Sequence, residues 1–179
     1  MADNDRVALV DLDGTLLFTE NSEGLAAKEV TGRRLRRSSI RKLDRGTKHK
    51  VYSLAQTKYA GAATPNERLK RRLSRIGESN VIILTARHSD TRRHTVMALK
   101  RHGIMYAKLL CRGGKARELD DEEWKLRVLK RYAKVYKKVE LYDDKLDNLA
   151  YMRDRIGMPN VSFIKVSKDS IISFPRKGE

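Results

Sequence analysis

The stretch that decides the fold is Val7–Leu16, which reads VALVDLDGTL. Its four leading apolar residues, followed by a loop that contains glycine, predict a buried parallel strand over residues 6–10. Asp11 and Asp13 are two positions apart, so their side chains point the same way from an extended chain. Gly14 allows the chain to leave the strand sharply. Two adjacent carboxylates repel each other unless a cation or a proton lies between them, so this strand end is a candidate cation site.

Two simpler interpretations compete with a cation site. An Asp-x-Asp-Gly sequence also occurs in ordinary surface turns, because Asp and Gly are common turn residues. A calcium loop of the EF-hand type requires oxygen ligands at alternating positions and glycine at the sixth position. Counted from Asp11, glycine comes at the fourth position, which excludes that loop. The rest of the chain must therefore supply partners for the two carboxylates.

The composition is that of a globular intracellular protein. The 179 residues are 40% hydrophobic, which suits one domain with a substantial core. No apolar run is long enough for a transmembrane helix, and the polar, acidic N-terminus is unlike a secretory signal. Cys111 is the only cysteine, which excludes an intrachain disulfide and a Cys-rich metal site. We expect a cytoplasmic protein that makes no membrane contact.

The charge is strongly basic and unevenly distributed. The formal net charge is +17, and residues 28–75 contain sixteen Lys or Arg but only three Asp or Glu. Basic runs are often solvated helix faces, but an excess of this size favours a polyanionic partner, namely nucleic acid or a nucleotide. The densest run supplies four candidate substrate-binding residues: Arg33, Arg34, Arg36 and Arg37.

Strand and helix patterns alternate along most of the chain. Further strands are expected at residues 81–84, 105–110, 139–142, 161–166 and 171–174, and helices at 65–76, 90–102, 122–136 and 146–156. This alternation predicts an α/β fold, a Rossmann-like doubly wound parallel sheet, in a single domain over residues 1–179. Residues 20–78 are too long for a plain crossover. We expect them to form a small, mostly helical basic cap, inserted after the first strand into a core of residues 1–19 and 79–179.

Three expected strands end in polar residues, and parallel strands present such ends at one edge of the sheet. These residues, together with a lysine near the start of a helix, are Asp11, Asp13, Thr85, Arg87, Asp143, Asp144 and Lys125. The set suits phosphoryl transfer. Carboxylates and water bind Mg²⁺, a carboxylate can attack phosphorus, and hydroxyl and ammonium groups stabilise phosphoryl oxygens. Lys115 is an alternative catalytic lysine, but the helix start fixes Lys125 better.

The motifs resemble those of haloacid dehalogenase (HAD) superfamily phosphatases. All four superfamily motifs occur in order: residues 11–16, Thr85, Lys125, and the pair Asp143–Asp144. A narrower resemblance is to the 3′-phosphatase domain of phage-type polynucleotide kinase-phosphatases, through residues 84–87, Trp124–Lys125 and residues 142–145. The sequence contains no G-x-x-x-x-G-K-[ST] loop, so the kinase part of such enzymes has no counterpart here.

The resemblance implies a role for each residue. Asp11 would be the nucleophile and a Mg²⁺ ligand, and Asp13 would act as acid and base while its backbone carbonyl binds the metal. Thr85 and Lys125 would bind the phosphoryl group, and Arg87 would contact the phosphate or nucleotide. The acidic pair of motif four, Asp143 and Asp144, would complete the metal site.

Three functions follow as hypotheses. The first is a Mg²⁺-dependent phosphomonoesterase that forms an aspartyl-phosphate and removes a 3′-phosphate from a polynucleotide, as in nucleic acid repair. The second is a nucleotidase or small-metabolite phosphatase. The third is a basic nucleic-acid-binding protein that keeps the fold without catalysis. The intact set of site residues favours an enzyme over the third hypothesis.

Overall fold

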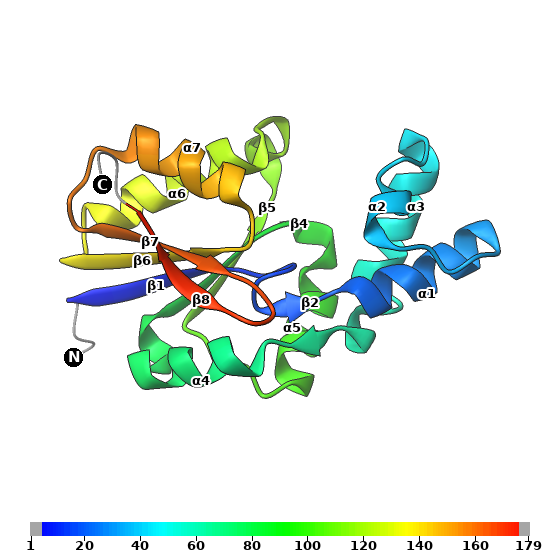
Figure 1. Cartoon of the computed structure of the whole chain (residues 1–179), viewed down its shortest axis with the longest axis horizontal. Coiled ribbons are helices and arrows are strands. Elements are labelled where there is room, and N and C mark those ends of the chain that lie inside the picture. The colour runs from blue at the N-terminus through cyan, green and yellow to red at the C-terminus, as the bar shows by residue number, and fades with distance from the viewer. Residues whose placement is uncertain (1–4, 176–179) are drawn as a thin grey trace.

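A six-stranded sheet with the strand order β5-β4-β1-β6-β7-β8 forms the centre of the molecule (Figure 1). The structure is a computed structural model that describes residues 5–175. All neighbouring strands are parallel except β7 and β8, which are antiparallel. The strands are β1 (Arg6–Asp11), β4 (Val81–His88), β5 (Lys108–Arg112), β6 (Lys138–Asp143), β7 (Val161–Val166) and β8 (Ile171–Phe174).

Helices cover both faces of this sheet, which confirms the doubly wound α/β fold. The first face carries α4 (Glu67–Ile76) and α5 (Arg92–Arg101), and the second carries α6 (Asp121–Ala133) and α7 (Leu146–Ile156). Side chains alternate between the faces along each strand. Within β1, Ala8 and Val10 therefore join the core cluster under α4, while Val7 and Leu9 join the cluster under α6 and α7. Sequence patterning alone accounts for this arrangement.

The register of the strands brings the predicted polar ends to one edge. Asp11 is level with Leu84 on β4, so Thr85 lies one position further along. On the other side of β1, Val10 is level with Tyr142, which puts Asp11 level with Asp143. From β1 the chain first adds β4 and β5 on one side and then β6, β7 and β8 on the other. Ligands usually bind at such a switch point of an open α/β sheet.

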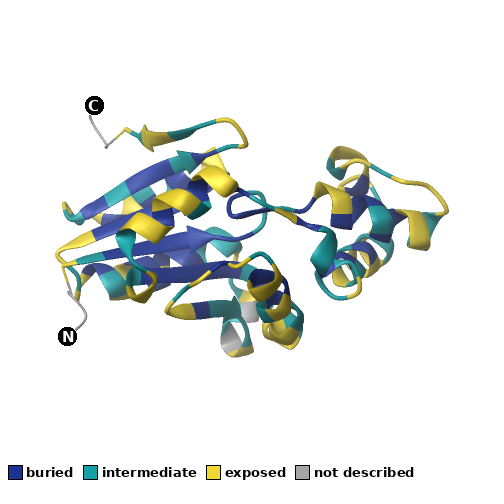
Figure 2. Ribbon diagram, turned by 90° about the horizontal axis from the view of Figure 1, so that it is seen from below, coloured by how far each residue is buried: buried dark blue, intermediate teal, exposed yellow. Residues whose placement is uncertain are grey.

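A separate helical unit lies beyond this edge. It contains α1 (Glu20–Thr31), α2 (Arg37–Ile40) and α3 (Arg45–Gln56), and it has its own small core around Ile40 and Val51. A short antiparallel pair, β2 (Leu17–Phe18) with β3 (Thr64–Pro65), joins it to the sheet domain. Figure 2 shows the two units with their separate buried interiors and the narrow connection between them. We refer to residues 19–63 as the cap.

The cap is shorter than the range of 20–78 expected from the sequence. Leu69 and Leu73 of α4 are buried against the sheet together with Ala8 and Ile83, so α4 belongs to the core. The predicted start of this helix was also wrong. It was expected at residue 65 but lies at Glu67, because Asn66 caps the helix: its side chain accepts a hydrogen bond from the Leu69 amide at 3.1 Å. Thr64 instead pairs with Phe18 across the connection, a contact that local sequence patterns do not show.

Other boundaries shift by a few residues. Short 3₁₀ turns at Ala60–Ala62, Glu78–Asn80, Ser89–Thr91 and Gly114–Glu118 link the main elements. The turn at Ser89–Thr91 delays α5 to Arg92, where residues 90–102 were expected to be helical. The expected strand at 105–110 is found at Lys108–Arg112. Within the cap, which was expected to be mostly helical, residues 33–59 form α2 and α3 with non-helical segments around them.

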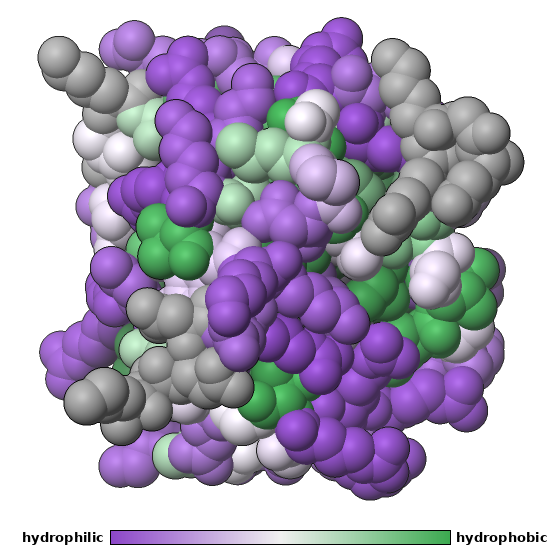
Figure 3. Space-filling model, turned by 90° about the vertical axis from the view of Figure 1, so that its left-hand side faces the viewer, coloured by the Kyte–Doolittle hydropathy of each residue, from purple (hydrophilic) through white to green (hydrophobic). Residues whose placement is uncertain are grey.

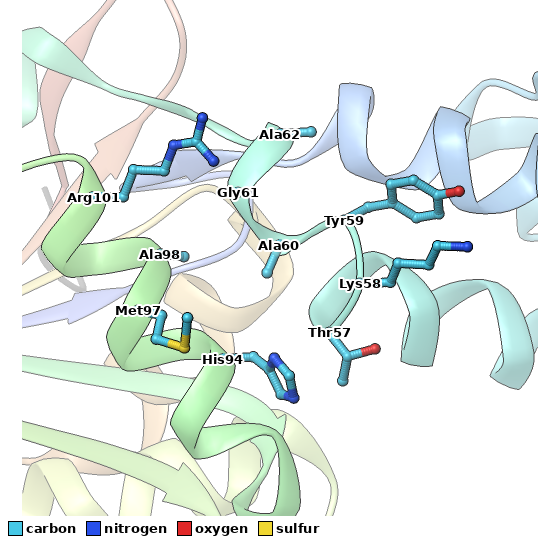
Figure 4. A pocket seen from close by; sticks show the side chains of 10 residues that line it. All are labelled: Thr57, Lys58, Tyr59, Ala60, Gly61, Ala62, His94, Met97, Ala98 and Arg101. Carbon is cyan, nitrogen blue, oxygen red and sulfur yellow. The ribbon is translucent and has the colours of Figure 1, made fainter.

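The return connection from the cap passes close to α5. The 3₁₀ turn at Ala60–Ala62 and the end of α3 face the α5 side chains His94, Met97 and Arg101 across a cavity of about 670 Å³ (Figure 4). A methyl group added at Gly61 would come within 2.7 Å of an Arg101 guanidinium nitrogen. That nitrogen is the far end of a flexible side chain, so a larger residue at position 61 would only displace the Arg101 guanidinium.

The surface at the opposite end of the sheet is mostly hydrophilic. Figure 3 views this end and shows hydrophobic side chains only as separate patches among charged and polar ones. Among the helices of residues 5–175, none combines the length and the apolar character needed to cross a bilayer.

The assignment of α4 to the core can be tested by one truncation. We expect Leu69→Ala to lower the free energy of unfolding by about 2–5 kcal/mol, because it leaves a cavity between α4 and the sheet. Chemical denaturation measures this loss. Arg71→Ala, on the exposed face of the same helix, should change stability by no more than about 0.5 kcal/mol. A loss from Leu69→Ala as small as that of the control would contradict the packing.

Candidate active site

Three carboxylates meet at the carboxyl edge of the sheet. Asp11 ends β1, Asp143 ends β6, and Asp144 follows directly. One oxygen from each lies within 4.8 Å of the others. Asp11 and Asp143 are buried and Asp144 is half-buried. The structure thus brings together three of the four predicted metal-binding residues.

Lys125 bridges the two buried carboxylates. Its Nζ donates to Asp11 Oδ1 and to Asp143 Oδ2, both at 2.8 Å, and it lies 3.2 Å from Asp121 Oδ2. The side chain is only 1% exposed. Burial by itself lowers the pKa of the amine, but Asp11, Asp143 and Asp121 outweigh it and raise the pKa well above its usual value. Lys125 is therefore a permanent cation inside the site. The side chain of Lys115, the alternative lysine, is not among those that the structure describes.

One lysine does not balance the acidic charge. Burial raises the pKa of Asp11 to about 7, with Lys125 opposing this rise and Asp143 and Asp144 adding to it. Burial and the neighbouring Asp143 also raise the pKa of Asp144. A divalent cation among these oxygens would reverse both shifts. The hard oxygen donors and their excess negative charge fit Mg²⁺.

The loop after β1 is shaped around these acids. Gly14 has a φ of +93°, which L side chains rarely adopt, and a methyl group there would come within 2.5 Å of Asp144 Oδ2. Thr15 is fully buried and its hydroxyl contacts Asp11 Oδ2 at 2.9 Å and Asp144 Oδ1 at 3.3 Å. The loop therefore contacts two of the three acids, Asp11 and Asp144, directly.

Asp13 is held apart from the cluster. Its carboxylate forms a forked ion pair with Arg87, at 2.8 Å from Nε to Oδ2 and 2.6 Å from Nη2 to Oδ1. Arg87 is 2% exposed and also donates to Thr95 at 3.2 Å. The sequence led us to expect Arg87 at the phosphate or nucleotide. That role stays a prediction: in the structure the Arg87 guanidinium holds the Asp13 carboxylate, and both residues line the cavity above the site.

Thr85 lies beside the cluster without joining its hydrogen bonds. The side chain is buried, and its hydroxyl oxygen accepts from the Arg87 amide at 3.2 Å. Thr85 is one position beyond the residue level with Asp11, so it lies at the same edge of the sheet as the acidic cluster.

Sequence reasoning missed several supporting residues. Asn148 donates to Asp143 at 3.2 Å and to Asp121 at 3.4 Å, and the Lys145 amide donates to Asp143 at 2.8 Å. Asp121 and Lys125 are four residues apart on one helix, and this spacing was the sequence signal for the ion pair between them. Nothing in the sequence distinguished Asn148 from a helix-surface residue, because its role depends on tertiary contacts.

A cavity of about 290 Å³ separates the core from the cap above the site. Asp13 and Arg87 line it from below, and Arg37, Arg41 and Tyr52 line it from the cap. Arg37 is tied to the cap, because it donates to Glu23 Oε2 at 2.9 Å. The other three predicted substrate-binding arginines are exposed and do not line this cavity: Arg33, Arg34 and Arg36.

Several solved structures share this fold. Two structures of the Pnkp1/Rnl/Hen1 complex, one described as an RNA repair complex, match with TM-scores of 0.57 and 0.58 at 21% and 18% identity. They cover 91% and 93% of this chain, which spans only 45% and 44% of theirs. A HAD-superfamily hydrolase from Geobacter sulfurreducens PCA matches with a TM-score of 0.58 at 14% identity, and the match covers 92% of this chain and 88% of that one. A candidate phosphatase from Clostridium difficile matches with a TM-score of 0.63 at 14% identity, and the match covers 99% of this chain and 90% of that one. No protein-family model and no curated protein sequence matches.

These likenesses show that the chain has the HAD fold, as its motifs predicted. A fold hosts many activities, so the function has to be argued from the site itself.

The acidic cluster predicts a specific dependence of stability on pH and Mg²⁺. The pKa of Asp11 is about 7 when folded, against an ordinary 3.8. The folded state therefore binds this proton more tightly, and its contribution to stability is lost as the pH rises from about 4 to about 7. Chemical denaturation in EDTA should show this fall in the free energy of unfolding. Asp11→Asn should remove the part of the fall that comes from Asp11.

The stabilisation of the folded protein by Mg²⁺ should increase as the pH rises. Because Mg²⁺ competes with protons for the carboxylates, it should stabilise the wild type more at about pH 8 than at about pH 5. Equal stabilisation of wild type and Asp11→Asn by Mg²⁺ at the higher pH would contradict the assignment of this cluster as the metal site.

Proposed function

We propose that this protein is a Mg²⁺-dependent phosphomonoesterase of the HAD type. The observation that carries the proposal is the buried ammonium of Lys125, held between Asp11 and Asp143 at 2.8 Å from each. A fixed cation and an acidic cluster at one strand edge suit a reaction that needs a carboxylate nucleophile and neutralisation of phosphoryl charge.

The reaction would proceed in two displacements. A carboxylate oxygen of Asp11 attacks phosphorus, the P–O bond to the substrate breaks, and Asp13, in its protonated form, gives its proton to the leaving oxygen. Asp13 then takes a proton from water as the water oxygen attacks the phosphorus of the aspartyl-phosphate. The P–O bond to Asp11 breaks, which releases inorganic phosphate and restores both carboxyl groups. Lys125 and the Thr85 hydroxyl stabilise the phosphoryl oxygens in both steps.

Mg²⁺ would be held by the carboxylates of Asp11, Asp143 and Asp144, with the backbone carbonyl of Asp13 as a further ligand. When bound, it neutralises charge on the phosphoryl oxygens and offsets the repulsion between the phosphate and the acidic cluster. Arg87 keeps the Asp13 carboxylate outside this cluster. Asp13 is therefore left for proton transfer.

The substrate we propose is a polynucleotide with a terminal 3′-phosphate. Three features support it: the basic cap, the sequence motifs of polynucleotide kinase-phosphatases, and the likeness to structures of an RNA repair complex. The cavity between core and cap offers Arg37, Arg41 and Tyr52 to a terminal nucleotide. The exposed Arg33, Arg34 and Arg36 extend this positive surface for the remaining strand.

A nucleotidase or small-metabolite phosphatase is the second candidate. The observation that favours it is the size of the cavity above the site, about 290 Å³, which lies at the lower end of the range for small-molecule sites. The basic surface outside that cavity has no use in such an enzyme.

A substrate panel tests the proposal. We expect phosphate release with Mg²⁺ but not with EDTA, faster from a 3′-phosphorylated oligonucleotide than from its 5′-phosphorylated isomer, a mononucleotide or p-nitrophenyl phosphate. Asp11→Asn should lower the rate by at least about a thousandfold, because it removes the nucleophile. Faster release from the mononucleotide or from p-nitrophenyl phosphate would favour the nucleotidase or small-metabolite phosphatase instead. Release from none of them would contradict the proposed function.

The role of Arg87 can be separated from substrate binding. We expect Arg87→Gln to lower kcat about ten- to a hundredfold with little change in KM, because Asp13 loses its orientation. Steady-state kinetics on p-nitrophenyl phosphate measures both constants, and circular dichroism confirms folding. A rise in KM at unchanged kcat would assign Arg87 to the phosphate instead.

A further inference from the structure

The basic block of the sequence is divided between two surfaces. Of its sixteen Lys and Arg residues, eleven belong to the cap and five belong to α4, which packs on the sheet. The five on α4 are Arg68, Lys70, Arg71, Arg72 and Arg75. Glu67 is the only acidic residue of this helix. A cap over the active site therefore does not explain the whole positive charge of the chain.

Arginines line a depression on the outer side of α4. Its volume is about 270 Å³, and four of its five lining residues are arginine, the fifth being Ile171 of β8. Two of these arginines are fixed: Arg68 donates to the Asp169 carbonyl at 2.8 Å, and Arg72 donates to the Tyr142 hydroxyl at 3.0 Å. Arg71 and Arg75 are exposed and, within the described residues, form no ion pair. The depression thus concentrates guanidinium groups without carboxylates on its walls.

The turn between β7 and β8 lies between this depression and the active site. A second cavity, of about 520 Å³, begins at Gly14 and Asp144 and reaches Lys168 in the turn between β7 and β8. The next residue in that turn, Asp169, accepts the hydrogen bond from Arg68. Figure 1 shows this turn close to β2, near the beginning of α4. A path from the metal site past Lys168 to the α4 arginines therefore passes basic side chains and also the acidic residues Glu20 and Asp169.

We propose that this surface binds the phosphodiester backbone of the nucleic acid strand whose phosphorylated end lies in the active site. We call it the α4 track and define it by Arg68, Arg71, Arg72, Arg75 and Lys168. The inference rests on the proposed function and adds a path for the strand. Planar guanidinium groups bind phosphate oxygens in pairs of hydrogen bonds. No aromatic residue lines the depression on α4, so it reads backbone charge without base stacking.

The dimensions of α4 set the length of nucleic acid needed. Its ten residues span about 15 Å, which matches about four nucleotides at roughly 3.4 Å each. Strands of about two nucleotides cannot occupy both the active site and the track, whereas strands of about twelve can. The contribution of the α4 track to binding should therefore grow with oligonucleotide length.

Binding is measured in the Asp11→Asn background, so that the bound oligonucleotide stays intact. Fluorescence anisotropy with 3′-phosphorylated oligonucleotides of about two and about twelve nucleotides gives Kd over a range of salt concentrations. Arg71→Gln with Arg75→Gln removes two charges from the track. Lys130→Gln with Lys134→Gln removes two charges from exposed positions at the end of α6, on the opposite face of the sheet, and serves as the control.

The track variant should weaken binding of the longer strand roughly tenfold near physiological salt. It should also lower the slope of log Kd against log salt by about 1.4, which corresponds to two phosphate contacts on a single strand. The control should leave both values unchanged. Equal effects of the two pairs, or an unchanged slope in the track variant, would overturn the α4 track.

This outcome is separate from the fate of the proposed function. Salt-dependent binding that needs Arg71 and Arg75, in a protein without phosphatase activity, would support the track and contradict the enzyme. Mg²⁺-dependent release of phosphate with unaltered binding in the track variant would support the enzyme and overturn the track.

Discussion

The structure depends on the compensation of buried negative charge by one lysine. Asp11 and Asp143 lie side by side at the ends of neighbouring strands, and Lys125 supplies the ammonium between them. Removing one partner of a buried ion pair leaves an uncompensated charge and costs several kcal/mol. The β1 and β6 strand ends and the start of α6 are therefore held in one arrangement. The residual negative charge, seen in the raised pKa of Asp11 and Asp144, calls for a further cation, and this requirement is the physical basis of the proposed metal site.

The rest of the molecule separates roles around that centre. Arg87 holds Asp13 away from the acidic cluster, and in the proposed reaction this second carboxylate transfers the proton. The cap is joined to the sheet domain by a narrow connection (Figure 2) and carries most of the basic block. Negative charge is thus concentrated at the reacting centre and positive charge around it, as suits a phosphorylated polyanion.

The sequence was informative where the signal is local. Apolar runs ending in polar residues located the strand ends, and parallel pairing then brought Asp11, Asp143 and Asp144 together as expected. Contacts between distant residues were beyond its reach. Thr64 and Pro65 have the sequence pattern of a helix start. In the structure they pair instead with β2, from which the whole cap separates them in the sequence. The partner of Arg87 and the role of Asn148 likewise follow from tertiary packing, which no spacing along the chain reveals.

The central claim is that Asp11 is the nucleophile, and its covalent intermediate can be observed directly. During turnover with Mg²⁺ and a 3′-phosphorylated oligonucleotide, borohydride would reduce an aspartyl-phosphate to homoserine. Mass spectrometry of the digested protein would locate that residue. The account predicts homoserine at position 11 only when substrate and Mg²⁺ are both present. Reduction at another residue, or none in an actively turning-over enzyme, would contradict it.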